Sequence, residues 1–142
     1  MLSFGITGDG FSWHTARELE VLTDKAVLDP AGIIFDDQFR SLTIHLRRYE
    51  LASGERSKRR LFTPYRYNKQ RQISATLVVR NVVDYQVEPV DCGLREVNLI
   101  LGVQLRNDCL LLRSAQELQG RSCFFLEVKF TDLDLILQDD NS

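Results

Sequence analysis

Five stretches of this chain alternate apolar with polar residues at a period of two. They cover residues 42–46, 73–79, 97–105, 124–130 and 133–137. In the first of them, Leu42, Ile44 and Leu46 are separated by Thr43 and His45. Successive side chains of a β-strand point to opposite faces, so this period predicts strands with one buried and one exposed face. An amphipathic helix would need a period of 3.6 residues instead.

Shorter apolar runs at residues 32–35, 82–87 and 109–113 bring the expected number of strands to seven or eight. Polar breaks such as Asp29-Pro30-Ala31-Gly32 and Asn107-Asp108 separate the runs. No long helical pattern lies between the strands, which argues against parallel βαβ units. The sequence therefore predicts a mainly β fold, either an antiparallel β-sandwich or a strongly curled sheet.

The N-terminal region is the part that the alternation describes least well. Residues 5–10 read GITGDG, lack the GK[ST] ending of a phosphate-binding loop, and are expected to form a flexible terminal turn. In residues 15–28, Thr15 and Glu18 have the spacing of a capping box. Four apolar residues share one helical face: Ala16, Leu19, Leu22 and Ala26. Because residues 17–21 also fit a strand, we expect at most one short helix, located before Pro30.

The length of 142 residues fits one domain, and we expect a single β-rich domain over residues 1–142. The longest apolar runs have four residues, whereas a membrane helix needs roughly 20, and no signal-peptide pattern opens the sequence. The three cysteines, Cys92, Cys109 and Cys123, are widely spaced and form no CxxC pair. We therefore expect reduced thiols, a cytoplasmic location and no contact with a membrane.

Charge is distributed very unevenly along the chain. Residues 40–80 contain eleven Lys and Arg residues but only Glu50 and Glu55 as acids, which makes this part +9. The remaining residues carry seven bases and eighteen acids, so they are −11, and the whole chain is −2 at pH 7. A nearly neutral total therefore hides a strong separation of charge.

The densest basic part is the segment 56–71, which has seven bases and no acid. It lies between two predicted strands and is expected to be a long hairpin connection, a kind of loop that often carries binding function. Arginine binds carboxylate and phosphate through its planar fork, and aromatic rings can stack on bases. The candidate binding residues are Arg56, Lys58, Arg59, Arg60, Tyr65, Arg66, Tyr67, Lys69 and Arg71.

The partner expected for the segment 56–71 is an acidic protein, with a phosphate-bearing ligand as the second choice. Nucleic acid is a weaker expectation, because the sequence pI of 5.7 is far below that of dedicated nucleic-acid-binding domains. The structural alternative is a solvated loop whose bases neutralise the protein's own acids. On balance we expect a non-enzymatic binding protein.

Signals for catalysis are weak. His14 and His45 are the only histidines, and Asp36 and Asp37 are the acidic pair that could complete a small hydrolase or metal-dependent site with them. No HxH or HxxxH spacing supports such a site. This enzyme remains an alternative, but we assign no catalytic residue, no metal ligand and no cofactor.

Asp132 and Asp134 are two residues apart on a predicted strand and therefore share a face. Paired carboxylates can bind a divalent cation. However, Leu133, Leu135 and Leu137 need the core side, which places both acids in solvent, where they would protect an edge strand.

A further alternative is a structural homo-oligomeric module, with a homodimer formed through a sheet face. Five apolar residues fall on the phase that should point outward: Val78, Val82, Val83, Phe125 and Ile136. They would either cover a second layer of the same chain or form an exposed patch. Four aromatic residues are expected in the core or at its edge: Trp13, Phe35, Phe39 and Tyr49.

Overall fold

The computed structural model describes residues 2–49, 71–89, 99–114, 117–118, 121–122 and 124–140. The elements in chain order are β1 (Ser3–Thr7), a 3-10 turn η1 (Gly8–Gly10), α1 (Trp13–Leu22), β2 (Val27–Asp36), β3 (Ser41–Tyr49), β4 (Gln72–Pro89), β5 (Leu99–Leu105), β6 (Cys109–Ser114), β7 (Glu117–Leu118), β8 (Arg121–Ser122) and β9 (Phe124–Asp139). Among these residues, no helix has the length and apolar character needed to cross a membrane.

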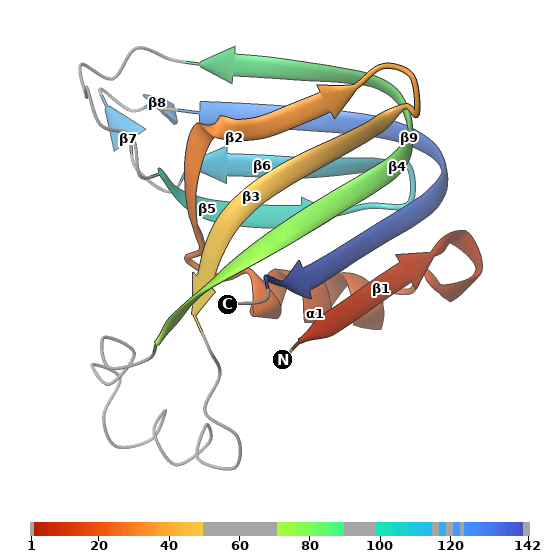
Figure 1. Cartoon of the computed structure of the whole chain (residues 1–142), viewed down its shortest axis with the longest axis horizontal. Helices are drawn as coiled ribbons and strands as arrows, with labels where there is room; N and C mark the ends of the chain where they lie inside the picture. The colour runs from red at the N-terminus through yellow and green to blue at the C-terminus, as the bar shows by residue number, and fades with distance from the viewer. Residues whose placement is uncertain are drawn as a thin grey trace.

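Seven of the strands form one antiparallel sheet in the order β1-β9-β4-β3-β2-β5-β6 (Figure 1). The first half of β9 also pairs with β6, the last strand in this order. The sheet is therefore so strongly curled that its β6 edge returns to β9. β7 and β8 form a separate two-stranded pair. The expectation of a mainly β protein with a strongly curled antiparallel sheet of seven to eight strands and one N-terminal helix is confirmed.

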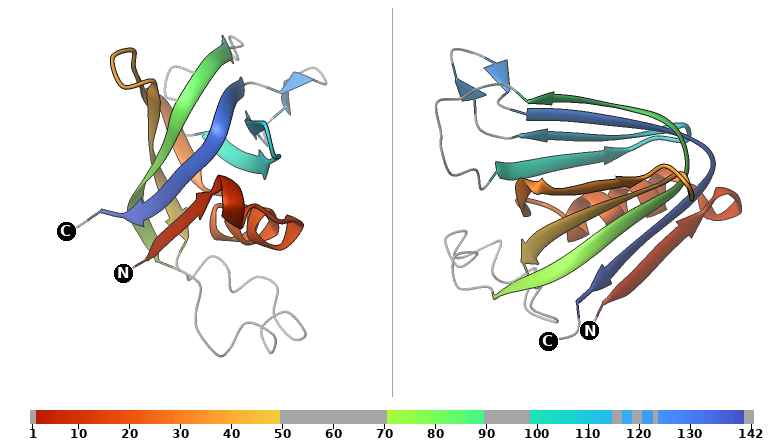
Figure 2. Two further views of the ribbon diagram at one scale, coloured as in Figure 1. Left: turned by 90° about the vertical axis from the view of Figure 1, so that its right-hand side faces the viewer. Right: turned by 45° about the horizontal axis from the view of Figure 1, so that its top comes forward.

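Two long strands, β4 and β9, bend together and carry the sheet from one layer into the other (Figure 2). At the bend Asn81 and Asp132 both have left-handed backbone conformations, with φ of 57° and 48°. The Asn81 side-chain amide donates to the Asp132 carbonyl at 2.8 Å. The sequence predicted separate strands on either side of this point, which was wrong because the turn residues bend each strand without ending it.

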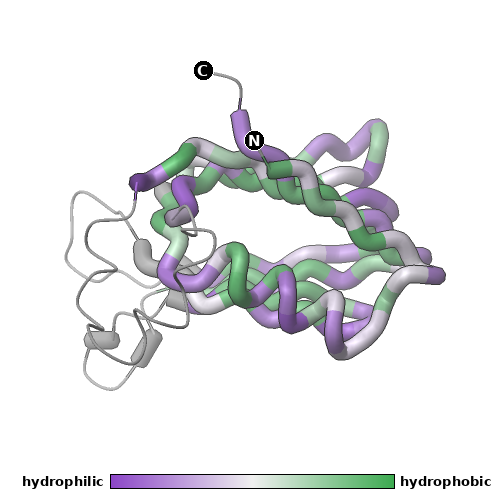
Figure 3. Tube along the Cα trace, turned by 90° about the horizontal axis from the view of Figure 1, so that it is seen from below, coloured by the Kyte–Doolittle hydropathy of each residue, from purple (hydrophilic) through white to green (hydrophobic). Residues whose placement is uncertain are grey.

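The core lies between the two layers and is filled by alternate residues of each strand. Hydrophobic and hydrophilic positions follow one another along the strands (Figure 3). The largest fully buried side chains are Phe124, Leu19, Leu28, Leu42, Ile44, Leu77, Leu105, Leu110, Leu112 and Leu126. Leu133, Leu135 and Leu137 are also buried, while Asp132 is exposed, so the predicted phase of this strand is confirmed.

α1 begins three residues earlier than the sequence suggested. The Ser12 hydroxyl accepts a hydrogen bond from the Thr15 N–H at 3.1 Å, and the Thr15 hydroxyl accepts one from the Ser12 N–H at 2.9 Å. The capping box is therefore Ser12 with Thr15, and the predicted pair of Thr15 with Glu18 was wrong. Ala16 and Leu19 are buried where the helix packs against β5.

The N-terminal residues form a strand, not the expected flexible turn. β1 pairs with the second half of β9, from Ser3 opposite Gln138 to Thr7 opposite Asp134. The buried side chain of Ile6 belongs to the core. Hydrogen bonding to β9 overrides the turn propensity of Gly5, and η1 follows only at Gly8.

Candidate binding surfaces

The predicted basic site falls almost wholly outside the described residues. Of its members only Arg71 is described, and it is exposed immediately before β4. Tyr49 at the end of β3 pairs with Gln72 at the start of β4, and the Gln72 amide donates to the Tyr49 hydroxyl at 3.1 Å. The strand ends on either side of residues 50–70 are therefore adjacent and joined by a side-chain hydrogen bond.

A buried ion pair lies in the sheet just below these strand ends. Arg48 donates to the Asp139 carboxylate from Nε and Nη2, both at 2.7 Å. The side chains are only 6% and 4% exposed. The Leu2 N–H donates to the same carboxylate at 2.9 Å, and Arg48 Nη1 donates to the Tyr49 carbonyl at 3.3 Å. Arg48 therefore anchors the end of β3 and is unavailable to a ligand.

The pKa of Asp139 follows from these contacts. Burial by itself would raise the pKa of this carboxyl, but the hydrogen bonds from Arg48 and from the Leu2 N–H, together with the charge of Arg48, lower it below its ordinary value of 3.8. The carboxylate is thus charged under physiological conditions. Sequence reasoning missed this pair, although Arg48 continues the buried phase of Leu42, Ile44 and Leu46.

Five ion pairs join an acid of the described residues to a base of the described residues. Asp37 pairs with Arg40 at 2.8 Å, Asp134 with Arg80 at 3.6 Å, and Asp139 with Arg48 as above. Two weaker surface pairs join Glu20 to Arg17 at 3.7 Å and Glu127 to Lys129 at 3.9 Å. These five acids therefore each have a basic partner among the described residues.

The histidines and the acidic pair proposed for an enzyme have separate roles. His14 is exposed on α1, and His45 is exposed on β3 with Nδ1 3.3 Å from the Thr76 hydroxyl. Asp36 caps the β2–β3 turn by accepting from the backbone N–H groups of residues 38 and 39 at 3.0 and 3.2 Å. Asp37 is paired with Arg40. Within the described ranges, no group of three or more His, Cys, Asp or Glu residues is placed to hold a metal ion.

An exposed aromatic corner lies where the β2–β3 turn meets the bend of β4. It consists of Arg40, Val83, Tyr85 and Phe35, the last half-buried against the core, and it adjoins the turn that carries Phe39. Phe39 is 70% exposed, Val83 54% and Tyr85 38%. The rings of Phe35 and Tyr85 are 4.7 Å apart between centroids. The expected core position of Phe39 was therefore wrong, because this residue lies in the turn beyond the last paired residues of β2 and β3.

Arg40 holds the aromatic corner together. Its guanidinium donates to the carbonyls of Val82 at 3.1 Å and Val83 at 2.6 Å, and lies 5.1 Å from the Phe35 ring centroid. Its own carbonyl accepts from the Val82 N–H at 2.9 Å. Backbone strain at a φ of 49° is compensated by these contacts. Arg40, one of the bases of residues 40–80, thus connects the β2–β3 turn to β4.

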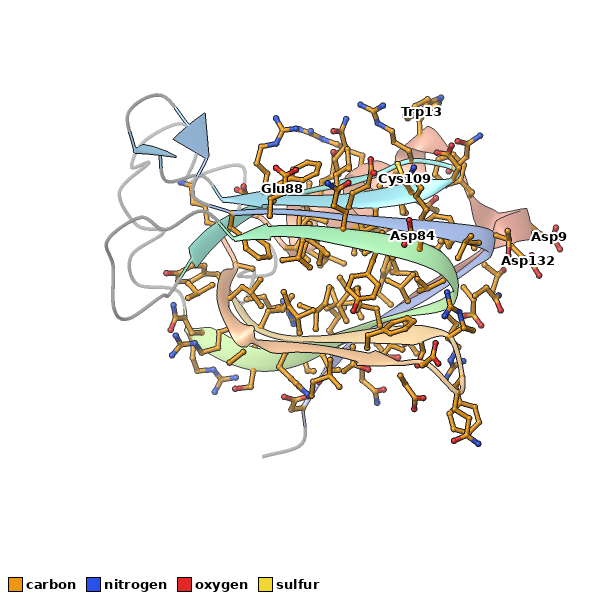
Figure 4. All side chains as sticks on the ribbon, turned by 90° about the horizontal axis from the view of Figure 1, so that it is seen from above. Asp9, Trp13, Asp84, Glu88, Cys109 and Asp132 are labelled. Carbon is orange, nitrogen blue, oxygen red and sulfur yellow. The ribbon has the colours of Figure 1, made fainter. Side chains whose placement is uncertain are left out.

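Trp13 and Cys109 are two further residues that the sequence analysis singled out. Trp13 projects from the start of α1 and is 77% exposed, with its ring edge against Phe11, so its expected core position was wrong (Figure 4). Cys109 is a half-buried free thiol whose pKa is raised by burial and by neighbouring Asp108, which disfavours a nucleophilic role. Cys92 and Cys123 lie outside the described residues.

The five apolar residues assigned to an outer phase do not form one patch. Val78 and Ile136 are register partners on the outer side of the sheet and are half-buried. Val82 is buried in the core because the register shifts on both sides of it. Val83 belongs to the aromatic corner, and Phe125 packs against the guanidinium of Arg113 at 5.6 Å.

Comparison with protein-family models, curated proteins and solved structures finds no match to this chain.

Proposed function

We propose that this chain is a non-enzymatic binding protein whose basic segment, residues 56–71, engages an acidic partner protein. The observation that carries the proposal is the partition of charge, with seven bases and no acid in residues 56–71 of a chain whose net charge is −2. Such a partition attracts an acidic partner to one part of the molecule and speeds association.

The framework that carries the segment supports this function. The two strand ends that flank it are adjacent in register at Tyr49 and Gln72. Beneath them the buried pair of Arg48 with Asp139 ties β3 to β9. The strand ends on either side of the binding segment are thus held in fixed positions. Recognition residues are commonly found on loops that connect the strands of a rigid β scaffold.

The ion pairs of the described residues also support an external partner. Asp37, Asp134 and Asp139 each have a described base as their partner. The structural alternative, in which the segment neutralises the protein's own acids, would draw on these carboxylates. Their existing pairs make these three carboxylates less available to the segment.

The test is a calorimetric titration with poly-glutamate as a model of an acidic protein surface. Reversal of three segment residues, Arg59→Glu, Arg60→Glu and Arg66→Glu, should weaken binding by about tenfold or more, and added salt should weaken binding of the wild type. The control reverses the same number of exposed bases elsewhere, Arg17→Glu, Arg106→Glu and Lys129→Glu, with an equal change in net charge. Equal affinities of the two triple variants would overturn the proposal.

A phosphate-bearing ligand is the second choice and is distinguished in the same titration. A single-stranded oligonucleotide of matched charge replaces poly-glutamate at the same salt concentration. Tighter binding of poly-glutamate supports the acidic-protein proposal. Tighter binding of the oligonucleotide, with a steeper dependence on salt, overturns it in favour of phosphate recognition.

A further inference from the structure

One outer face of the sheet carries a row of four residues across four neighbouring strands, here called the apolar row because its two central members are Ile136 and Val78. Gly5 of β1 is opposite Ile136 of β9, Ile136 is opposite Val78 of β4, and Val78 is opposite Thr43 of β3. The residues on either side of each strand position are buried in the core: Leu135, Leu137, Leu77, Val79, Leu42 and Ile44. The row of Gly5, Ile136, Val78 and Thr43 therefore points outward, away from that core.

The two rows that flank the apolar row consist of polar residues. On one side Ser3, Gln138, Thr76 and His45 follow one another across the same four strands. On the other side Thr7 is opposite Asp134, and Asp134 is opposite Arg80. Arg80 and Asp134 form a solvent-exposed pair at 3.6 Å, so they are the charged groups that border the centre of this face.

We propose that this face is an interface with a second copy of the chain. The twofold axis lies in the interface, runs parallel to the strands and passes between β9 and β4. Rotation about such an axis exchanges the positions of the two central strands while keeping each row in place. Ile136 then meets Val78 of the partner subunit, and Asp134 meets Arg80 of the partner subunit.

Self-complementarity is what identifies the occupant as a second copy. Asp134 and Arg80 lie in the same row on opposite sides of the proposed axis, so each of these two charges meets its opposite across the interface. The apolar row meets itself in the same way, and the outer small residue Gly5 meets Thr43 of the partner subunit. Stacked sheets pack about 10 Å apart, a separation that interdigitated Ile and Val side chains fill.

The proposal is independent of the proposed function, because it involves none of residues 56–71. It is tested by measuring the molar mass of the full chain over a range of concentrations, using light scattering and sedimentation. The wild type should approach twice 16.4 kDa as concentration rises. Arg80→Asp gives an all-acidic charged row and Asp134→Arg an all-basic one, so each should raise the dissociation constant by about tenfold or more.

Mixing the two single variants provides the decisive measurement. The acidic row of one chain then faces the basic row of the other, so an equimolar mixture should form a heterodimer with the wild-type dissociation constant. If Arg80 and Asp134 interact only within one chain, mixing the two variants should not restore dimerisation. Lys129→Asp is the matched control on a different part of the surface and should leave dimerisation unchanged.

A second variant blocks the face without changing charge. A Cβ added at Gly5 would meet the Leu135 carbonyl oxygen at 3.6 Å and Ile136 Cγ1 at 4.0 Å, which are ordinary contacts. Gly5→Tyr should therefore fold normally but fill the proposed interface and give a monomer. A wild type that stays monomeric at every concentration would overturn the proposal, as would a dimer that persists in both Arg80→Asp and Gly5→Tyr.

Discussion

Arg48 and Asp139, separated by 91 residues in the chain, are joined by two hydrogen bonds of 2.7 Å inside the sheet. β4 lies between the strands that carry them, since Arg48 is opposite Ile73 and Asp139 is opposite Ala75. The same carboxylate accepts the Leu2 N–H, and the Leu2 carbonyl accepts the Asp139 N–H at 3.0 Å. One buried carboxylate thereby connects β3, β9 and the start of the chain.

Asp139→Asn should lower the free energy of unfolding by about 3–5 kcal/mol, because it leaves the Arg48 charge buried without a counter-charge. Urea denaturation followed by circular dichroism measures the change. The double variant Arg48→Met with Asp139→Leu should recover much of the loss, since it removes both desolvated charges. Asp134→Asn, at the exposed pair with Arg80, is the control and should cost no more than about 1 kcal/mol. A cost at Asp139 as small as at Asp134 would contradict the anchoring role.

The stability that this carboxylate contributes should depend on pH in a defined direction. The pKa of Asp139 is lowered in the folded state, so its contribution is fully present above the ordinary value of 3.8 and is lost as pH falls through the folded pKa. The difference in unfolding free energy between wild type and Asp139→Asn should therefore be constant from about pH 7 to about pH 5 and shrink below about pH 4. A difference that already shrinks above pH 5 would show a raised pKa instead.

Left-handed conformations at the bend predict which substitutions the two long strands tolerate. Asn81→Val and Asp132→Val should each lower the free energy of unfolding by about 1–2 kcal/mol, because a β-branched residue is strained at φ of 57° or 48°. Asn81→Val also removes the hydrogen bond to the Asp132 carbonyl. Asp132→Gly should be tolerated. Thr131→Val, one residue from Asp132 and exposed, is the matched control in denaturant unfolding, and an equal loss there would contradict the argument.

Cys109 should react slowly with thiol reagents. Burial and the charge of Asp108 raise the pKa of this thiol, so less thiolate is present near neutral pH than for an unperturbed cysteine. In a Cys92→Ser, Cys123→Ser background, alkylation by iodoacetamide followed by mass spectrometry should be slower than for a free cysteine. Asp108→Asn should increase the rate by about twofold or more, whereas the distant Asp36→Asn should not. Reaction as fast as that of a free cysteine would disprove the raised pKa.

Local patterns were enough to predict most strands and the side of each that is buried. Leu42, Ile44 and Leu46 are buried as expected, and so are Leu133, Leu135 and Leu137. The breaks at Asn81 and Asp132 were also visible as interruptions of the alternation. Whether the chain would end a strand there or only bend it was not predictable. Both outcomes use the same kinds of residue, and they differ only in whether the residues before and after the break pair with the same neighbouring strand.

The candidate surfaces were predictable in part. The basic segment follows from composition and stays a prediction, because all of it except Arg71 lies outside the described residues. The aromatic corner was missed. Arg40 contacts the Phe35 ring and binds the carbonyls of Val82 and Val83, so the corner depends on contacts between residues more than forty positions apart. The apolar row likewise needs the register of four strands before Ile136 and Val78 become neighbours.

Periodicity and charge composition are local quantities, and from them follow the β class, the phase of the strands, the single helix and the basic segment. Strand partners and their register are non-local, since identical alternation allows many pairings of similar energy. Folding selects among these pairings by burying all apolar faces in one core while giving every buried charge a counter-charge. That selection pairs β1 and β6 with β9, and it places Arg48 against Asp139.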